Sequence, residues 1–230
     1  IMEVCYKDGV WSEPHIFQPL SDRVYIRPGF DPDGKLYVSS AQIPGGNGGL
    51  DLWYMANFSD TLLTPVNLGS PVNTDKIETG QSFTKNGDIY FTSYIPGKRW
   101  DRGIVMSEFN NGSYTEPVPL SERINIRDEN AVDYLSYVSS DASYLLFSSN
   151  RHDSSMESCR IYISFKDGNN EWGDAVNLSK FLGLDEDNRD PALSPDGKYL
   201  FFSSDSNIMW VKTSVIDKCR RRMSSCVKAH

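Results

Sequence analysis

Four oxygen-bearing side chains recur at a nearly constant spacing along this chain. Tyr25, Glu78, Asp133 and Asn188 are separated by 53, 55 and 55 residues. Groups of this kind bind cations, ordered water or polar ligands when they converge on one point. If each holds the same place in a repeated unit, we expect them to meet near a shared axis. The alternative is that each caps its own turn or holds a channel water.

Charged side chains flank these four positions. Arg27 and Arg189 carry guanidinium groups that suit a carboxylate or hydroxyl ligand, and Asp190 follows directly. The predicted ligand site therefore consists of Tyr25, Arg27, Glu78, Asp133, Asn188, Arg189 and Asp190. We expect no cofactor and no dedicated metal site, although a channel cation would suit this set. The remaining charges nearby indicate a solvated rim: Asp22, Arg23, Asp128, Glu129, Asp185, Glu186 and Asp187.

A repeated β-hairpin positions these residues. Leu193 ends a short apolar run, Ser194-Pro195-Asp196-Gly197 has the composition of a tight turn, and a second apolar run follows from Lys198 to Ser204. Related text recurs around Gly34, Gly87 and Ala142, with spacings of 53, 55 and 55 residues up to Gly197. A fixed period of this length is typical of repeat architectures.

Two further strands follow each hairpin, and the last of them carries prolines such as Pro65 and Pro117. Because proline cannot donate to a ladder, that strand belongs at a sheet edge. Four strands per period with little helical periodicity predict an all-β chain, a β-propeller of four-stranded antiparallel blades. A two-sheet sandwich is the runner-up, but it does not require a fixed period. The predicted propeller domain spans 1–212, with blades at about 21–72, 73–125, 126–180 and 181–212.

The ends of the chain leave two arrangements open. Residues 1–20 match the third and fourth strands of a blade whose first hairpin is absent, which indicates about five blades with the first incomplete. Alternatively, the two termini together close four blades. We favour the first, because 207–211 already covers the last hairpin. Residues 213–230 are expected to form a basic, solvated C-terminal tail.

The motif Ser-Pro-Asp-Gly-Lys-x-Leu-x-Phe-Ser-Ser, with the strand and the x-Gly-x-Trp-x-Glu-Pro segment that follow it, resembles the TolB-like (WD40-like) β-propeller repeats of bacteria. The chain is similar in particular to stand-alone five-repeat proteins of that group over residues 1–212. It departs from the pattern at Ala142, Leu62, Gly103 and Arg160. The resemblance implies the propeller fold and a location in the periplasm or outside the cell. It does not by itself specify a function, since this repeat serves binding scaffolds, translocation-system subunits and the non-catalytic domains of peptidases alike.

Composition excludes several classes of protein. The net charge of −8 disfavours nucleic-acid and anionic-membrane partners, and no apolar run is long enough to span a bilayer. The chain begins at Ile1 and shows no signal segment. Three histidines (His15, His152, His230) lack metal-ligand spacing, and Cys159 has no identifiable partner base. Cys219 and Cys226 could pair, or all four cysteines stay free.

Several other residues have structural interpretations. Trp11, Tyr114 and Trp172 recur before the fourth strand, and with Trp53 and Trp210 they are expected to pack between blades. A possible aromatic and basic patch comprises Arg99, Trp100, Asp101, Arg102, Arg151 and His152, which as isolated loop residues are expected to be ordinary surface. The glycine-rich run at 44–49 is expected to be a loop.

These observations favour a monomeric, non-catalytic module that presents its channel and loops to a peptide, protein or glycan. The alternative is a hydrolase or lyase that acts on a carbohydrate or peptide at the acidic channel mouth. A third hypothesis, an auxiliary fragment of a larger peptidase, requires a catalytic domain elsewhere.

Overall fold

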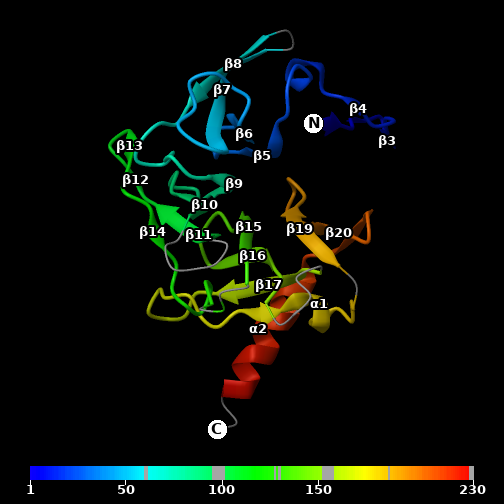
Figure 1. The fold of residues 1–230 in the computed structure, drawn as a ribbon. Coiled ribbons are helices and arrows are strands. Elements are labelled where there is room, and N and C mark those ends of the chain that lie inside the picture. Colours follow the sequence, from blue (N-terminus) through cyan, green and yellow to red (C-terminus); the bar gives the residue numbers. More distant parts are fainter. Residues whose placement is uncertain are drawn as a thin grey trace.

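A computed structural model describes residues 1–59, 62–94, 102–126, 128, 131–151, 158–185 and 187–227. Within them, four antiparallel sheets follow one another along the chain as the blades of a β-propeller (Figure 1). The sequence prediction of the fold is confirmed. No helix within these ranges has both the length and the apolar character needed to cross a membrane.

The first three blades have four strands each, and the fourth has three. Blade 1 contains β5 (Ile26–Phe30), β6 (Leu36–Ser40), β7 (Asp51–Ser59) and β8 (Leu62–Asn67). Blade 2 contains β9 (Thr79–Phe83), β10 (Ile89–Tyr94), β11 (Arg102–Ser107) and β14 (Val118–Pro119), with a small hairpin of β12 (Phe109–Asn110) and β13 (Ser113–Tyr114). Blade 3 contains β15 (Asp133–Val138), β16 (Tyr144–Ser149), β17 (Arg160–Phe165) and β18 (Val176–Asn177). Blade 4 contains β19 (Asn188–Leu193), β20 (Tyr199–Ser204) and β21 (Asn207–Lys212).

The residues before blade 1 form two short ladders. β1 (Met2–Glu3) pairs with β4 (His15–Ile16), and β2 (Tyr6–Lys7) pairs with β3 (Val10–Trp11). A 3-10 turn, η1 (Gln18–Leu20), then leads into β5. In the part of the chain that the structure describes, β1 and β4 form their own sheet and do not join β19, β20 and β21.

The hairpin turns have the conformation that their sequences predict. Gly34, Gly87 and Gly197 adopt φ values of 80°, 89° and 69°, which glycine tolerates without steric cost. Ala142 takes the same place in blade 3 with φ 55°, a left-handed conformation that is unfavourable for a residue with a Cβ. Prolines occur at both edges of the blades. Pro65 lies in the outer strand β8, whereas Pro28 and Pro191 lie in the innermost strands β5 and β19.

Apolar side chains are buried between successive blades. Tyr37 and Leu52 of blade 1 pack against Phe83, Ile89 and Phe91 of blade 2. Similar clusters join blade 2 to blade 3 and blade 3 to blade 4. The fourth cluster packs Ile1 and Phe17 of the N-terminal segment against blade 1.

The prediction of a solvated C-terminal tail is wrong. Ser214–Val227 form the helix α2, which follows β21 directly (Figure 1). Cys219 lies one turn beyond Val215 and Ile216 on the same face, and all three are buried in the cluster between blades 3 and 4. A shorter helix, α1 (Leu178–Phe181), contributes Leu178 to the same cluster.

Candidate functional site

The innermost strands of the four blades line one cavity of ≈490 Å³. Arg27 and Pro28 come from β5, Gly80 and Gln81 from β9, Leu135 and Ser136 from β15, and Asp190 and Pro191 from β19. This cavity is the central channel of the propeller, and it is the candidate ligand site.

Every strand around the channel contains an irregularity in its pairing with the next strand. Three residues at these irregularities have positive φ: Arg27 at 52°, Gly80 at 68° and Asp190 at 53°. A β-bulge releases one residue from the ladder and turns its side chain away from the regular direction. The bulges therefore aim Arg27 and Asp190 at the channel instead of at a neighbouring blade.

Gly80 allows the innermost strands to approach closely. A Cβ at this position would lie 2.9 Å from the carbonyl oxygen of Leu135, at a φ that other residues rarely adopt. Hydrogen bonds across the blades fix the approach. Leu135 donates its backbone N–H to the Thr92 hydroxyl at 2.8 Å, and Asp190 donates its N–H to the Ser148 hydroxyl at 2.9 Å.

Two of the predicted site residues meet in the channel. The Arg27 guanidinium forms an ion pair with the Asp190 carboxylate, which links blade 1 to blade 4. Both side chains remain partly accessible, at 30% and 50%. The Gln81 side-chain amide also donates to the Arg27 carbonyl at 2.8 Å, so the backbone of this bulge is held from blade 2.

The other predicted site residues form hydrogen bonds with neighbouring residues and, within the described part of the chain, not with one another. Tyr25 donates its hydroxyl to Asp22 at 2.9 Å, and burial together with this bond raises the pKa of Tyr25 to about 12. Arg189 donates its Nε to Asp187 at 2.7 Å. Asn188 is fully buried and donates its backbone N–H to the Cys159 carbonyl at 3.0 Å. Cys159 itself is a buried free thiol whose pKa is raised by burial.

Glu78 is fully buried and accepts hydrogen bonds from its own blade. The Thr74 hydroxyl donates at 2.6 Å, the Thr74 backbone N–H at 3.1 Å and the Ser93 hydroxyl at 3.3 Å. Burial raises the pKa of the Glu78 carboxyl, and these bonds offset part of that rise.

This shift gives a pH-dependent stability. Because the folded-state pKa of Glu78 lies above the ordinary value of 4.5, the stability it contributes is complete below that value and is lost as pH rises through the folded-state pKa. We expect the free energy of unfolding of the wild type to fall relative to that of Glu78→Gln as the pH rises above 4.5. Urea unfolding at several pH values measures it, and parallel curves for the two proteins would contradict this assignment.

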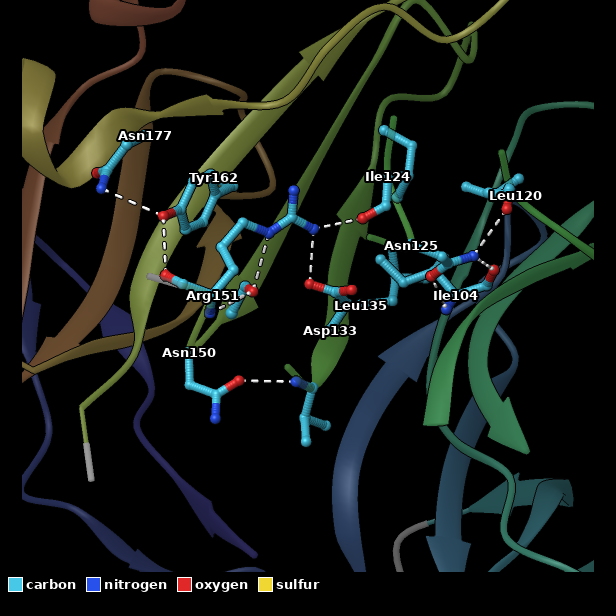
Figure 2. Close-up of polar contacts among 12 residues, drawn as sticks. Ile104, Leu120, Ile124, Asn125, Asp133, Leu135, Asn150, Arg151, Tyr162 and Asn177 are labelled. Carbon is cyan, nitrogen blue, oxygen red and sulfur yellow. Dashed lines mark hydrogen bonds and ion pairs between the residues drawn. The ribbon is translucent and has the colours of Figure 1, made fainter. Parts of the chain in front are cut away.

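Asp133 is the centre of a buried polar network that the sequence did not reveal (Figure 2). Its carboxylate accepts a bond from the Arg151 guanidinium at 2.6 Å, and both side chains are at most 4% exposed. Arg151 also donates to the carbonyl of Ile124 and, at 3.0 Å, to the Ser149 hydroxyl. The prediction that Arg151 is ordinary surface is therefore wrong.

Aromatic rings complete the surroundings of Arg151. Its guanidinium carbon lies 4.9 Å from the ring centroids of both Phe147 and Tyr162. These contacts are favourable because the ring faces carry partial negative charge. The network fixes the loop after β16 to the inner strand β15, so its role is to support the channel wall.

A buried polar side chain after the outer strand of each of the first three blades binds the backbone of the third strand, and the sequence did not reveal this contact. Asn125 accepts the backbone N–H of Ile104 at 2.8 Å and donates to the carbonyls of Ile104 at 2.8 Å and Leu120 at 2.9 Å (Figure 2). Asn73 makes the same pair of bonds with Leu52 in blade 1, and the Ser179 hydroxyl accepts from Ile161 in blade 3. The signal was an Asn that recurs after the fourth strand and is replaced by Ser in blade 3.

Other predictions have mixed outcomes. Trp172 packs edge-on against Tyr90 of the preceding blade, with 6.1 Å between the ring centroids, as expected. Trp11 and Trp210 are 63% and 57% exposed, so the expectation that they pack between blades is wrong. Glu129, Glu186, Arg99, Trp100, Asp101 and His152 lie outside the described residues. Among the described residues, no group of three or more His, Cys, Asp or Glu side chains is placed to hold a metal ion.

No protein-family model and no curated protein matches this chain. Among the solved structures that match, a putative 6-phosphogluconolactonase from Bacteroides uniformis is 17% identical, with a TM-score of 0.41 over 82% of this chain and 50% of that protein. The dihydro-heme d1 dehydrogenase NirN, solved in complex with DHE, is 15% identical, with a TM-score of 0.39 over 82% of this chain and 34% of that protein. The chain thus spans half or less of the length of either protein, and the likeness is one of fold.

Proposed function

We propose that this protein is a TolB-like propeller that acts as a non-catalytic binding module and holds a short peptide segment of a partner in its central channel. The single observation that carries the proposal is the Arg27–Asp190 ion pair, which places one group of each charge on the wall of a ≈490 Å³ cavity. The repeated Pro-Asp-Gly hairpins support the TolB-like assignment. That resemblance is also the basis for proposing a monomer in the periplasm or outside the cell.

The chemistry of the channel fits a peptide better than a glycan. A guanidinium group binds carboxylates through paired N–H donors, so Arg27 suits a peptide carboxylate, while Asp190 suits an ammonium or amide donor. Backbone groups at the bulges add hydrogen-bonding partners along the wall. A neutral glycan has no charge to exchange with either member of the ion pair.

The alternative function, a hydrolase or lyase for carbohydrates or peptides, has one observation in its favour. Burial raises the pKa of Glu78, as a general acid requires. However, Glu78 and Asp133 are both 0% exposed, and Asp133 is held by Arg151. A substrate would have to displace these contacts before it reached either carboxyl.

Peptide binding tests the proposed function. The probes are short fluorescein-labelled peptides that differ only in a free or an amidated C-terminal carboxylate. We expect the free-carboxylate peptides to bind the wild type and to lose at least about tenfold in affinity with Arg27→Met, because a charged hydrogen bond is removed. Fluorescence anisotropy measures the dissociation constants.

Arg23→Met is the matched control. Arg23 pairs with Asp22 at 2.7 Å outside the channel lining, and its loss is expected to leave binding unchanged. Equal affinity of wild type and Arg27→Met for all probes would contradict the proposal. Cleavage of a probe by the wild type but not by Glu78→Gln would establish the alternative function.

A further inference from the structure

A second cavity lies between blades 1 and 2, on the side of the propeller that carries the hairpin turns. Its volume is ≈470 Å³, and within the described part of the chain none of its lining residues also lines the channel. Blade 1 contributes Tyr54 and residues of the turn 31–35, and blade 2 contributes the turn 85–87. Phe109 and Tyr114 of the β12–β13 hairpin also line this space, which we call the interblade cavity.

The interblade cavity is open because blade 2 carries a smaller ring where blade 3 carries a tryptophan. Tyr37 of blade 1 and Tyr90 of blade 2 hold the same place in their ladders. Trp172 of blade 3 packs edge-on against Tyr90 and is 7% exposed. Tyr114, which pairs across its hairpin as Trp172 does across the corresponding turn, takes this place beside Tyr37. Its single ring leaves part of the space unfilled.

Aromatic rings from both blades form part of the cavity wall. The Tyr54 ring lies 5.9 Å from that of Tyr37, and the Phe109 ring lies 5.0 Å from that of Tyr114, measured between centroids. Phe109 is 40% exposed, so its ring is accessible to a ligand. The faces of such rings carry partial negative charge, which attracts the C–H groups on one face of a sugar ring. The wall therefore suits the apolar face of a saccharide.

Charges of both signs line the cavity in equal number. The lining contains two lysines and two aspartates, namely Lys35, Lys85, Asp31 and Asp33. Among the described residues neither ammonium group has an ion-pair partner, and that of Lys35 lies 4.5 Å from the centroid of the Tyr54 ring. A charged ligand would meet a like charge as well as an opposite one, whereas a hydroxyl group both donates and accepts. This balance favours a neutral ligand with several hydroxyl groups.

Two tyrosine hydroxyls add further polar contacts to the cavity. The Tyr37 hydroxyl forms a side-chain hydrogen bond with the Tyr114 hydroxyl. Burial raises the pKa of both groups, that of Tyr114 to about 12, so both keep their protons even in weakly alkaline solution. Protonated hydroxyls can donate and accept, as the hydroxyls of a sugar require of their partners.

We propose that the interblade cavity binds a neutral saccharide, whose ring packs against Phe109 and Tyr114 and whose hydroxyl groups bond to the charged side chains of the two turns. The cavity volume lies within the range of about 300–1,000 Å³ that small-molecule sites occupy. A cationic ligand fits less well, because Lys35 already lies over the Tyr54 ring. An anionic ligand would face Asp31, whose carboxylate is held in place by two backbone N–H groups of its turn at 2.9 and 3.0 Å. The inference is independent of the channel ligand.

Neutral disaccharides serve as probes, namely cellobiose, maltose, lactose and N,N′-diacetylchitobiose. We expect at least one of them to give saturable binding in NMR measurements of saturation transfer from the protein. Phe109→Ala is expected to raise its dissociation constant about fivefold or more, because a stacking surface is lost. Phe201→Ala is the matched control, since Phe201 is 37% exposed on blade 4, away from the cavity. We expect this variant to bind as the wild type does.

Tyr114→Trp is the second test variant, because it places the ring of Trp172 at the equivalent position and fills the cavity. It is expected to abolish disaccharide binding while the protein keeps a cooperative thermal transition. Absence of saturable binding of every probe to the wild type overturns the proposal, and so does equal affinity of the wild type and Phe109→Ala. Loss of binding in Arg27→Met but not in Phe109→Ala also overturns it, because the sugar would then occupy the channel.

Discussion

Replacing Arg151 with Met is expected to lower the free energy of unfolding by about 3–5 kcal/mol, the usual cost of removing one partner from a buried ion pair. The substitution leaves the fully buried Asp133 carboxylate without its guanidinium and removes the donors to Ser149 and the Ile124 carbonyl. It also removes the cation that lies beside the stacked Phe147 and Tyr162 rings. The loss is large compared with the 5–15 kcal/mol that holds a typical domain together.

Guanidinium chloride unfolding measures this loss, with Arg23→Met as the control. Arg23 and Asp22 are 31% and 52% exposed, and such surface pairs contribute at most about 1 kcal/mol. If the uncompensated charge causes the loss, then the double variant Arg151→Met with Asp133→Asn regains at least about 1 kcal/mol relative to Arg151→Met. A loss below about 1 kcal/mol in Arg151→Met would show that the network contributes little to folding.

Asn125→Ala is expected to cost about 3 kcal/mol, because it removes three hydrogen bonds and leaves the buried N–H of Ile104 without its acceptor. Asn125 is 6% exposed, so water does not readily replace the side chain. The bonds hold β11 to the segment that leads into blade 3, and their loss affects both blades.

Two variants make this prediction specific. Asn125→Ser retains a hydroxyl acceptor, as Ser179 does in blade 3, and is expected to lose less than Asn125→Ala. Asn110→Ala removes a 3.3 Å bond to Glu108 on an exposed hairpin and is expected to change stability by less than about 0.5 kcal/mol. Chemical unfolding of the three variants provides the comparison, and equal losses in Asn125→Ala and Asn110→Ala would contradict the assigned role.

The repeated hairpin was predictable because its turn residues have a local physical requirement. Gly34, Gly87 and Gly197 need positive φ, and the apolar runs that follow them are short and continuous, as strands buried on both faces require. The position of each blade then follows from the period. This information is local, and it is therefore present in the sequence.

The support of the channel was not predictable, because it depends on contacts between distant segments. Arg151 follows a strand in a polar loop, and nothing in that context distinguishes a buried guanidinium from a solvated one. The bulges at Arg27 and Asp190 are equally hidden, since positive φ is uncommon for all residues other than glycine, even though Asp adopts it more often than most. The basic residues Arg220, Arg221 and Arg222 concealed the apolar face of α2, whose Val215, Ile216 and Cys219 reach the core.

The sequence could not show which of the predicted site residues meet in the channel, because the direction of each side chain depends on contacts with distant segments. Arg27 and Asp190 meet because two bulges turn them toward the channel. Glu78 and Asp133 have the predicted spacing but bond to Thr74 and Arg151, respectively. Spacing thus predicted the strands on which the side chains lie, but not the direction in which they point.

The most direct test of the central claim is a crystal structure of the protein with the free-carboxylate peptide that binds most tightly. We predict peptide density between β5 and β19, with a peptide carboxylate within hydrogen-bonding distance of Arg27 and the Arg27–Asp190 ion pair opened. Peptide density on an outer surface, with that ion pair intact, would contradict the assignment of the channel as the binding site.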